Sequence, residues 1–176
     1  MENVLKRKSI RLNNYDYSQP GYYFITICVE KRISILGKIE NKTIQLTNFG
    51  EIVKRYWQEI PLNFPNIALD KFVIMPNHIH GILIIDSPVG AIHELPLLIN
   101  DRKQRRLMTI PKVIGKFKMQ SAKSINILRK TPNNPFWQRN YFEQIIKGNN
   151  SLEKIRYYID SNPENWETDP ENLKNC

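Results

Sequence analysis

Two histidines, His78 and His80, are the residues of this chain whose type and spacing most directly suggest chemistry. The sequence holds only 3 histidines, and a single residue, Ile79, separates these two. Alternate side chains of a β-strand project from the same face, so both imidazoles would project together, roughly 7 Å apart along the strand. Two such imidazoles can share one divalent metal ion. The spacing therefore predicts a metal site, with a solvent-facing polar pair as the alternative.

The flanking residues predict that this pair lies at the mouth of a central strand. Met75, Pro76 and Asn77 form a turn signal, because proline fixes φ and asparagine tolerates tight turns. The run from 81 to 85 is apolar on both faces, which is typical of a strand covered on both sides. The histidines would then be accessible from water at the start of the strand, which favours a site over a polar surface pair.

A helix near the C-terminus is expected over residues 151–161. Asn150 and Glu153 resemble a capping box, with Asn150 as the N-cap and Glu153 at the N3 position. Pro163 disfavours helical geometry at the residue before it, so the helix must end near that point.

Tyr158 and Asn162 lie one turn apart on the apolar face of this helix, whereas Tyr157 points nearly opposite. Ordinary packing and C-terminal capping would explain the pair without chemistry. Beside two histidines, the Asn162 carboxamide oxygen would complete a three-ligand set for a hard cation such as Mg²⁺ or Mn²⁺. The Tyr158 phenol would lie next to that ion, and with a pKa near ~10 it would need a base or solvent to become a nucleophile.

The predicted elements follow the order β, α, β, β, α, β, α. Periodicity and turn signals place them at 21–29 (strand), 36–46 (hairpin), 47–60 (helix), 67–74 and 78–85 (strands), 111–129 (helix), within 136–146 (strand) and 151–161 (helix). This order is that of an α+β, ferredoxin-like split βαβ domain: an antiparallel sheet with helices on one face and an added C-terminal helix that carries the tyrosine.

The length of 176 residues fits one domain. We expect a basic arm over 1–19, the main domain over 20–166 with a basic loop at 86–111, and an unstructured acidic tail over 167–176. His93 in the loop is interpreted as a surface histidine.

The charge balance favours an anionic partner. The chain has 26 Lys and Arg against 17 Asp and Glu, a net charge of +9, and a surplus of this size points to nucleic acid before a membrane surface. A merely soluble basic protein is the alternative. Cys28 and Cys176 give neither a disulfide framework nor a metal-binding pair. We find no signal peptide and no apolar run of ~18 residues, so we expect a cytoplasmic protein that does not contact membranes.

The segment 73–81 resembles the HUH motif (His, bulky apolar residue, His) of the single-tyrosine HUH transposases. Downstream, segments 137–141 and 155–163 resemble the REP-associated tyrosine transposases within that group, and the resemblance spans roughly residues 8–166. A bare His-x-His is weakly specific. Preceded by Met-Pro-Asn and followed by a Tyr-x-x-x-Asn-Pro helix, it becomes a specific signature.

The resemblance implies a ferredoxin-like or RRM-like sheet, a divalent metal and a tyrosine that cuts single-stranded DNA near hairpin or palindromic elements. It implies His78 and His80 as metal ligands, Asn162 as the third ligand and Tyr158 as the nucleophile, which would form a 5′-phosphotyrosine and free a 3′-hydroxyl. Tyr157 and Tyr141 remain alternative nucleophiles. A monomer and a homodimer are both compatible with the resemblance.

The same resemblance places DNA contacts on the basic arm, the basic loop, the lysine-rich helix and the segment after it. The candidates are Lys6, Arg7, Lys8, Arg11, Arg102, Lys103, Arg105, Arg106, Lys116, Lys118, Lys123, Trp137 and Arg139. Aromatic residues at four positions could stack unpaired bases, although such residues more often belong to a core: Tyr15, Tyr17, Trp137 and Tyr141.

Two other functions compete with a transposase. A non-catalytic DNA-binding module of the same fold would bind DNA with salt-dependent affinity and form no covalent adduct. A metal-dependent phosphodiesterase that uses water would still act after Tyr158→Phe, whereas a tyrosine transesterase would not.

Overall fold

The main sheet is antiparallel and has four strands in the order β4-β5-β1-β6. A computed structural model describes residues 15–86 and 107–173. The strands are β1 (Gly21–Cys28), β4 (Ile67–Ile74), β5 (His78–Ile85) and β6 (Phe142–Ile146). This order, with β1 and β5 in the centre, is the one that a split βαβ domain requires, so the predicted fold class is confirmed.

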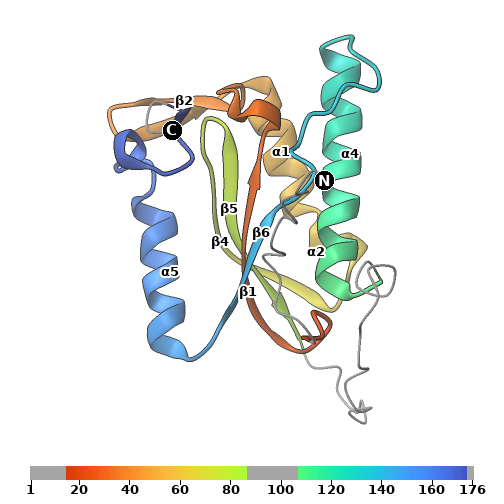
Figure 1. The fold of residues 1–176 in the computed structure, drawn as a ribbon, viewed down its shortest axis with the longest axis vertical. Helices are drawn as coiled ribbons and strands as arrows, with labels where there is room; N and C mark the ends of the chain where they lie inside the picture. The colour runs from red at the N-terminus through yellow and green to blue at the C-terminus, as the bar shows by residue number, and fades with distance from the viewer. Residues whose placement is uncertain (1–14, 87–106, 174–176) are drawn as a thin grey trace, which may run out of the picture.

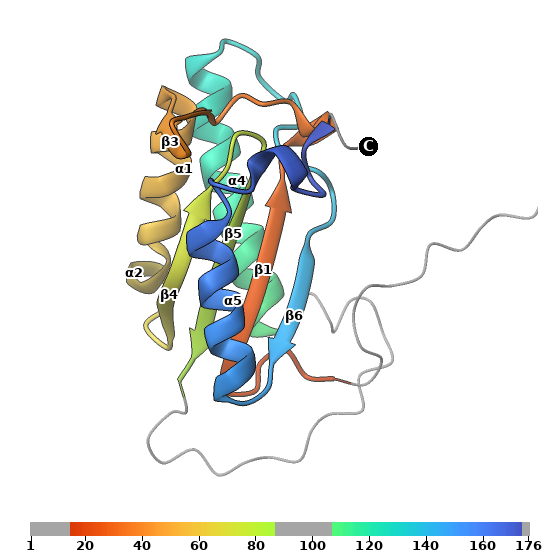
Figure 2. The same ribbon diagram turned by 90° about the vertical axis from the view of Figure 1, so that its left-hand side faces the viewer.

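Helices cover both faces of the sheet, as Figures 1 and 2 show. Two helices, α1 (Asn48–Gln58) and α4 (Thr109–Leu128), pack on one face, and α5 (Asn149–Ser161) lies on the other. The remaining elements are short: η1 (Glu30–Arg32), β2 (Gly37–Glu40), β3 (Thr43–Leu46), α2 (Ile60–Asn63) and η2 (Trp166–Thr168). No helix within the described ranges is both long and apolar enough to cross a bilayer.

The alternation of side chains along the strands divides the apolar residues into two layers. The larger layer lies under α1 and α4 and includes Tyr23, Ile25 and Ile79, all fully buried. The smaller layer lies under α5 and consists of Phe24, Ile82, Ile146, Leu152 and Ile159. Burial of α5 against this second layer fixes the face of the helix that meets the sheet.

Gly81 marks a close approach between the sheet and α1. A Cβ atom at this position would lie 2.4 Å from Cζ2 of Trp57. Trp57 is itself fully buried and packs edge-to-face against Phe117 at a centroid distance of 5.3 Å. No space exists for a methyl group unless the indole moves.

We therefore expect Gly81→Ala to lower the free energy of unfolding by about 1–3 kcal/mol, the usual cost of overpacking a core. The control is Gly115→Ala in the middle of α4, where a Cβ would meet nothing within 4 Å. That substitution should instead raise the free energy of unfolding by about 0.5–1 kcal/mol, because alanine restricts the unfolded chain and favours a helix. Urea unfolding curves measure both, and a neutral Gly81→Ala would contradict the packing.

Some predicted details of the helices are wrong. The N-cap of α5 is Gly148, with φ 76° and no side-chain cap, and Glu153 pairs with Arg156 at 2.7 Å instead of closing a capping box. Helix α4 begins two residues before Pro111, since proline fits the first turn of a helix.

The predicted N-terminal arm is packed at its end. Tyr17 is buried in the larger core layer, and its carbonyl accepts a hydrogen bond from the Ile110 backbone N–H. Tyr17 therefore cannot stack a DNA base, because packing against the core covers its ring. Residues 1–14 and 87–106 lie outside the described residues, and with them the candidates Lys6, Arg7, Lys8, Arg11, Arg102, Lys103, Arg105, Arg106 and His93.

Candidate metal and tyrosine site

The two histidines lie at the start of β5, on the face that α5 covers. His78 pairs with Cys28 of β1, and His80 pairs with Thr26. The predicted projection from one face is confirmed, since the two Nε2 atoms are 2.9 Å apart. Access from water is not as predicted: His78 is 0 % and His80 3 % exposed, because other parts of the chain cover them.

Both imidazoles are oriented by hydrogen bonds at their outer nitrogens. Nδ1 of His78 lies 2.7 Å from the Asn77 side-chain oxygen, and Nδ1 of His80 lies 2.7 Å from the Thr26 hydroxyl. When each Nδ1 carries the hydrogen and donates it, both Nε2 lone pairs face the same point. Such outer hydrogen bonds are the usual support of histidines that bind a metal.

The histidines are uncharged at neutral pH. Burial lowers the pKa of His80 to about 3. Burial also lowers the pKa of His78 well below its ordinary value, and the neighbouring His80 and the Arg32 guanidinium add to this effect. The neutral imidazole is the form that binds a metal ion.

The geometry fits one divalent cation. Two nitrogens that bind the same ion at right angles, each roughly 2.1 Å from it, are about 3.0 Å apart, close to the 2.9 Å between the Nε2 atoms of His78 and His80. Asp169 supplies a carboxylate oxygen 3.9 Å from His78 Nε2. Ligand atoms of these three buried residues all lie within 4.8 Å of one another, so this group can hold a divalent metal.

The sequence gives no signal for Asp169 as a site residue, because residues 167–176 are expected to be an unstructured acidic tail. That expectation is wrong for residues 167–173, which fold back onto the strand ends. Glu171 is the main anchor: its carboxylate pairs with Arg32 at 2.8 Å, its carbonyl accepts a hydrogen bond from Asn77 at 2.7 Å, and its backbone N–H donates to Asp169 at 2.6 Å. Hydrogen bonds, and not apolar burial, hold this segment, so a hydrophobic pattern could not reveal it.

The Tyr158 hydroxyl lies 3.2 Å from His80 Nε2. Its ring packs edge-to-face on Phe24, while the residue stays 39 % exposed. Tyr157 is 75 % exposed and points away, which confirms the predicted helical phase. Burial raises the pKa of Tyr158, and the negative charge of Asp169 raises it further. A hydrogen bond from Asn162 lowers this pKa, but by less than the other two effects raise it. The phenol therefore keeps its proton at neutral pH.

Two ion pairs fasten α5 to β4 and so position Tyr158. The Arg156 guanidinium binds both oxygens of Asp70, with its shortest distance at 2.6 Å. Lys71 and Asp160 form the second pair, at 3.0 Å. The sequence does not indicate these pairs, because charges on a strand and a distant helix give no local signal.

Asn162, the predicted third ligand, is 2 % exposed and lies beside the site. Its side chain hydrogen-bonds to Tyr158 and Asp169, and in both cases the bond lowers the pKa of the partner, as donation from the amide group would. Its carbonyl oxygen is buried and has no hydrogen-bond partner in the described part of the chain. A buried amide oxygen in this state is suited to a cation. The structure thus brings two candidates for the third ligand, Asn162 and Asp169, next to the histidines.

Substitution of Asp169 tests whether Asp169 or Asn162 is the third metal ligand. If its carboxylate binds the metal, Asp169→Asn should weaken Mn²⁺ binding at least about tenfold, because the only anionic ligand is lost. Glu164→Gln, an exposed position nearby with the same change in charge, is the control and should leave the affinity unchanged. Isothermal titration with Mn²⁺ measures both. Unchanged affinity in Asp169→Asn, together with a loss in Asn162→Ala, would assign the third ligand to Asn162.

Known proteins with a similar sequence or structure show to which family the chain belongs and which fold it shares. No protein-family model matches the chain. An uncharacterized protein of Haemophilus influenzae (strain KW20) is 40 % identical over 167 residues, which cover 93 % of this chain and 91 % of that protein. The chain belongs to the family of this Haemophilus protein.

The fold of this chain is found in a solved structure. The structure of a REP-associated tyrosine transposase bound to a REP hairpin matches with a TM-score of 0.61 and 15 % identity, over 89 % of this chain and 73 % of that chain. This chain therefore shares the α+β fold of that transposase. A Deinococcus radiodurans R1 protein, itself only provisionally assigned as a transposase, has a TM-score of 0.47 and 15 % identity over 81 % of this chain.

The remaining candidates for DNA contact differ in their accessibility. Lys123 and Arg139 are exposed. Lys116 lies over the ring of Phe64, 5.5 Å from its centroid. Trp137 is 5 % exposed, and its indole N–H donates to Ser121 at 3.0 Å, so the expectation that it stacks DNA bases is wrong.

Proposed function

We propose that this protein is a metal-dependent, single-tyrosine DNA transposase of the HUH group, closest to the REP-associated branch. It would cleave single-stranded DNA near hairpin or palindromic elements through a 5′-phosphotyrosine intermediate. One observation carries the proposal: the Tyr158 hydroxyl lies 3.2 Å from one of two imidazoles that converge beside a buried carboxylate. The fold shared with a transposase bound to a REP hairpin supports it.

The chemistry is a transesterification in which Tyr158 attacks phosphorus. A Tyr158 oxygen–phosphorus bond forms, the bond from phosphorus to the 3′-oxygen breaks, and the released 3′-oxygen takes up a proton. Burial raises the pKa of Tyr158, so its proton must leave during the attack, and the partly exposed residue can release it to solvent. The phosphotyrosine keeps the bond energy for later strand joining. All groups of this site belong to one chain, so a monomer suffices for it.

The residues that would hold a metal are His78 and His80 through their Nε2 atoms, with Asp169 or Asn162 adding oxygen. A bound Mg²⁺ or Mn²⁺ would polarise the phosphate under attack. The mixture of imidazole nitrogen and oxygen favours Mn²⁺, because imidazole suits transition metals better than Mg²⁺. The neutral state of both histidines at pH 7 suits this role.

The test is a denaturing gel of the protein incubated with labelled single-stranded hairpin DNA, in Mn²⁺ or in EDTA. We expect a protein–DNA band that survives denaturation and forms only with the metal. Binding without any such band, across several hairpins with varied flanks, would contradict the proposal and favour a non-catalytic module. Metal-dependent cutting without a covalent band would favour a phosphodiesterase that uses water.

A further inference from the structure

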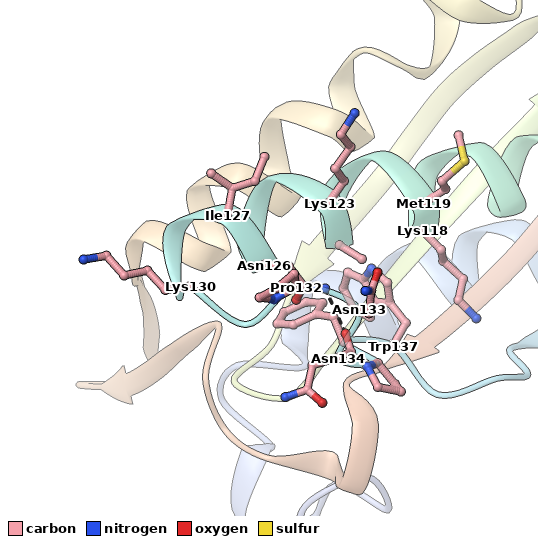
Figure 3. A pocket seen from close by; sticks show the side chains of 13 residues that line it. Lys118, Met119, Lys123, Asn126, Ile127, Lys130, Pro132, Asn133, Asn134 and Trp137 are labelled. Atoms are coloured by element: carbon pink, nitrogen blue, oxygen red, sulfur yellow. Dashed lines mark hydrogen bonds between the residues drawn. The ribbon is translucent and has the colours of Figure 1, made fainter.

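A groove of about 810 Å³ lies between the second half of α4 and the segment 130–137 (Figure 3). It lies across the sheet from α5, on the α4 side, and none of the residues of the metal and tyrosine site lines it. Its walls combine lysines, asparagines and apolar side chains: Lys118, Met119, Ala122, Lys123, Asn126, Ile127, Lys130, Pro132, Asn133, Asn134, Pro135, Phe136 and Trp137.

The groove is positively charged. Lys118, Lys123 and Lys130 line it, and no aspartate or glutamate does. Lys123 and Lys130 are exposed at its rim. Lys118 is half-buried and donates to the carbonyls of Gln138 and Arg139, at 2.5 and 3.1 Å, and burial lowers its pKa to about 8. Exposed lysines in a groove that no acidic side chain lines form an attractive surface for an anion.

The floor and one wall of the groove are apolar. Met119 and Ile127 are 65 % and 69 % exposed, so their apolar surface is open to a ligand. Phe136 continues this surface into the core, where it is almost fully buried. Apolar side chains that alternate with lysines suit a flat ring that is attached to an anionic group.

Contacts within the protein hold the loop wall of the groove in place. The Asn126 side chain donates to the Asn134 carbonyl at 2.9 Å, shown by a dashed line in Figure 3, and accepts from Arg129 at 2.9 Å. The Arg129 guanidinium lies over the Phe136 ring, 5.4 Å from its centroid. A preformed wall lowers the entropy cost of binding.

The groove wall is joined directly to the strand end that carries the metal site. The Gln138 backbone N–H donates to the Cys28 carbonyl at 2.9 Å, and the Glu30 N–H donates to the Phe136 carbonyl at 2.8 Å. Cys28 is the residue of β1 that pairs with His78. The groove and the site thus lie at the same end of the sheet on its two faces, so one strand of DNA that crosses this end could reach both.

We propose that this groove binds an unpaired nucleotide of single-stranded DNA, with its base against Ile127 and its phosphates on Lys123 and Lys130. The choice of DNA as the anion rests on the proposed function. The exposed lysines next to an apolar wall favour a nucleotide over an apolar peptide. An apolar peptide would form no favourable contact with the positive charge of the lysines.

The experiment measures binding of a fluorescent oligothymidylate by anisotropy over a range of salt concentrations. The double variant Lys123→Ala and Lys130→Ala should bind at least about tenfold more weakly. The plot of log affinity against log salt concentration should become less steep by about 1.4, which is roughly 0.7 for each lost phosphate contact. The matched control, Lys112→Ala with Lys147→Ala, removes the same charge at exposed positions outside the groove and should change the affinity less than about twofold.

A second variant tests the base contact. Ile127→Ala should weaken binding without changing the salt slope, because it removes apolar contact and no charge. Equal losses in the two double variants would overturn the proposal and indicate diffuse attraction, and unchanged DNA binding in the groove variants would overturn it in favour of another ligand. These outcomes are independent of the proposed cleavage: a wild-type protein that binds through the groove but forms no covalent band would refute only the proposed function.

Discussion

Tyr158→Phe is expected to lower the rate of covalent protein–DNA adduct formation by at least about 10⁴-fold, because it removes the attacking oxygen and leaves no group to replace it. The variant keeps the ring that packs on Phe24 and loses only a hydroxyl whose hydrogen bond to His80 is 3.2 Å long. Its stability should therefore stay within about 1.5 kcal/mol of the wild type. Single-turnover assays with labelled hairpin DNA measure the rate, and thermal unfolding monitors the fold.

The matched control is Tyr157→Phe, at the adjacent and 75 % exposed position on the opposite face of α5. We expect its adduct rate to remain within about threefold of the wild type, because no site residue contacts an exposed side chain there. An adduct that persists in Tyr158→Phe and disappears in Tyr157→Phe would reverse the assignment. Persistence in both single variants would move the nucleophile to Tyr141.

His78→Ala should abolish cleavage and leave hairpin binding largely intact. The substitution removes one of two converging nitrogens of the metal site, whereas basic residues carry most of the affinity for DNA. Cleavage is measured with saturating Mn²⁺, and binding is measured by anisotropy with the same DNA. Equal losses of binding and cleavage would contradict this division of roles.

Metal binding gives a readout that does not depend on activity. Mn²⁺ should raise the unfolding temperature of the wild type, since a ligand at 100 times its dissociation constant stabilises the folded state by about 2.7 kcal/mol. In His78→Ala the shift should be much smaller at the same concentration. If Mn²⁺ raised the unfolding temperature of this variant as much as that of the wild type, the metal would have to bind at another site.

The sequence predicted the sheet and the tyrosine helix well because their signals are local. β4 and β5 occupy 67–74 and 78–85 as expected, since a turn signal separates two runs of strand-forming residues. The face of α5 that carries Tyr158 and Asn162 followed from helical periodicity, and burial confirms that face.

Asp169 could not be predicted, because its role depends on contacts that are distant along the chain. Its segment folds back through Glu171, which binds Arg32 and Asn77. An acidic, proline-containing stretch gives no periodicity from which such a return could be inferred.

Trp137 illustrates the opposite error. An aromatic residue beside basic residues fits base stacking and core packing equally well in a sequence. Its bridge to Val29 and its hydrogen bond to Ser121 place it in the core, and only the tertiary structure shows those partners.

Covalent linkage of Tyr158 to the 5′-phosphate of cleaved DNA is the step on which the proposed function depends. The most direct measurement is mass spectrometry of the adduct after digestion with trypsin and nuclease. Cleavage after Arg156 yields a peptide that begins at Tyr157 and includes Tyr158, and fragment ions distinguish the two. We predict a nucleotide attached through its 5′-phosphate to Tyr158. A nucleotide on Tyr157 or Tyr141, or cleaved DNA with no modified peptide, would contradict the account.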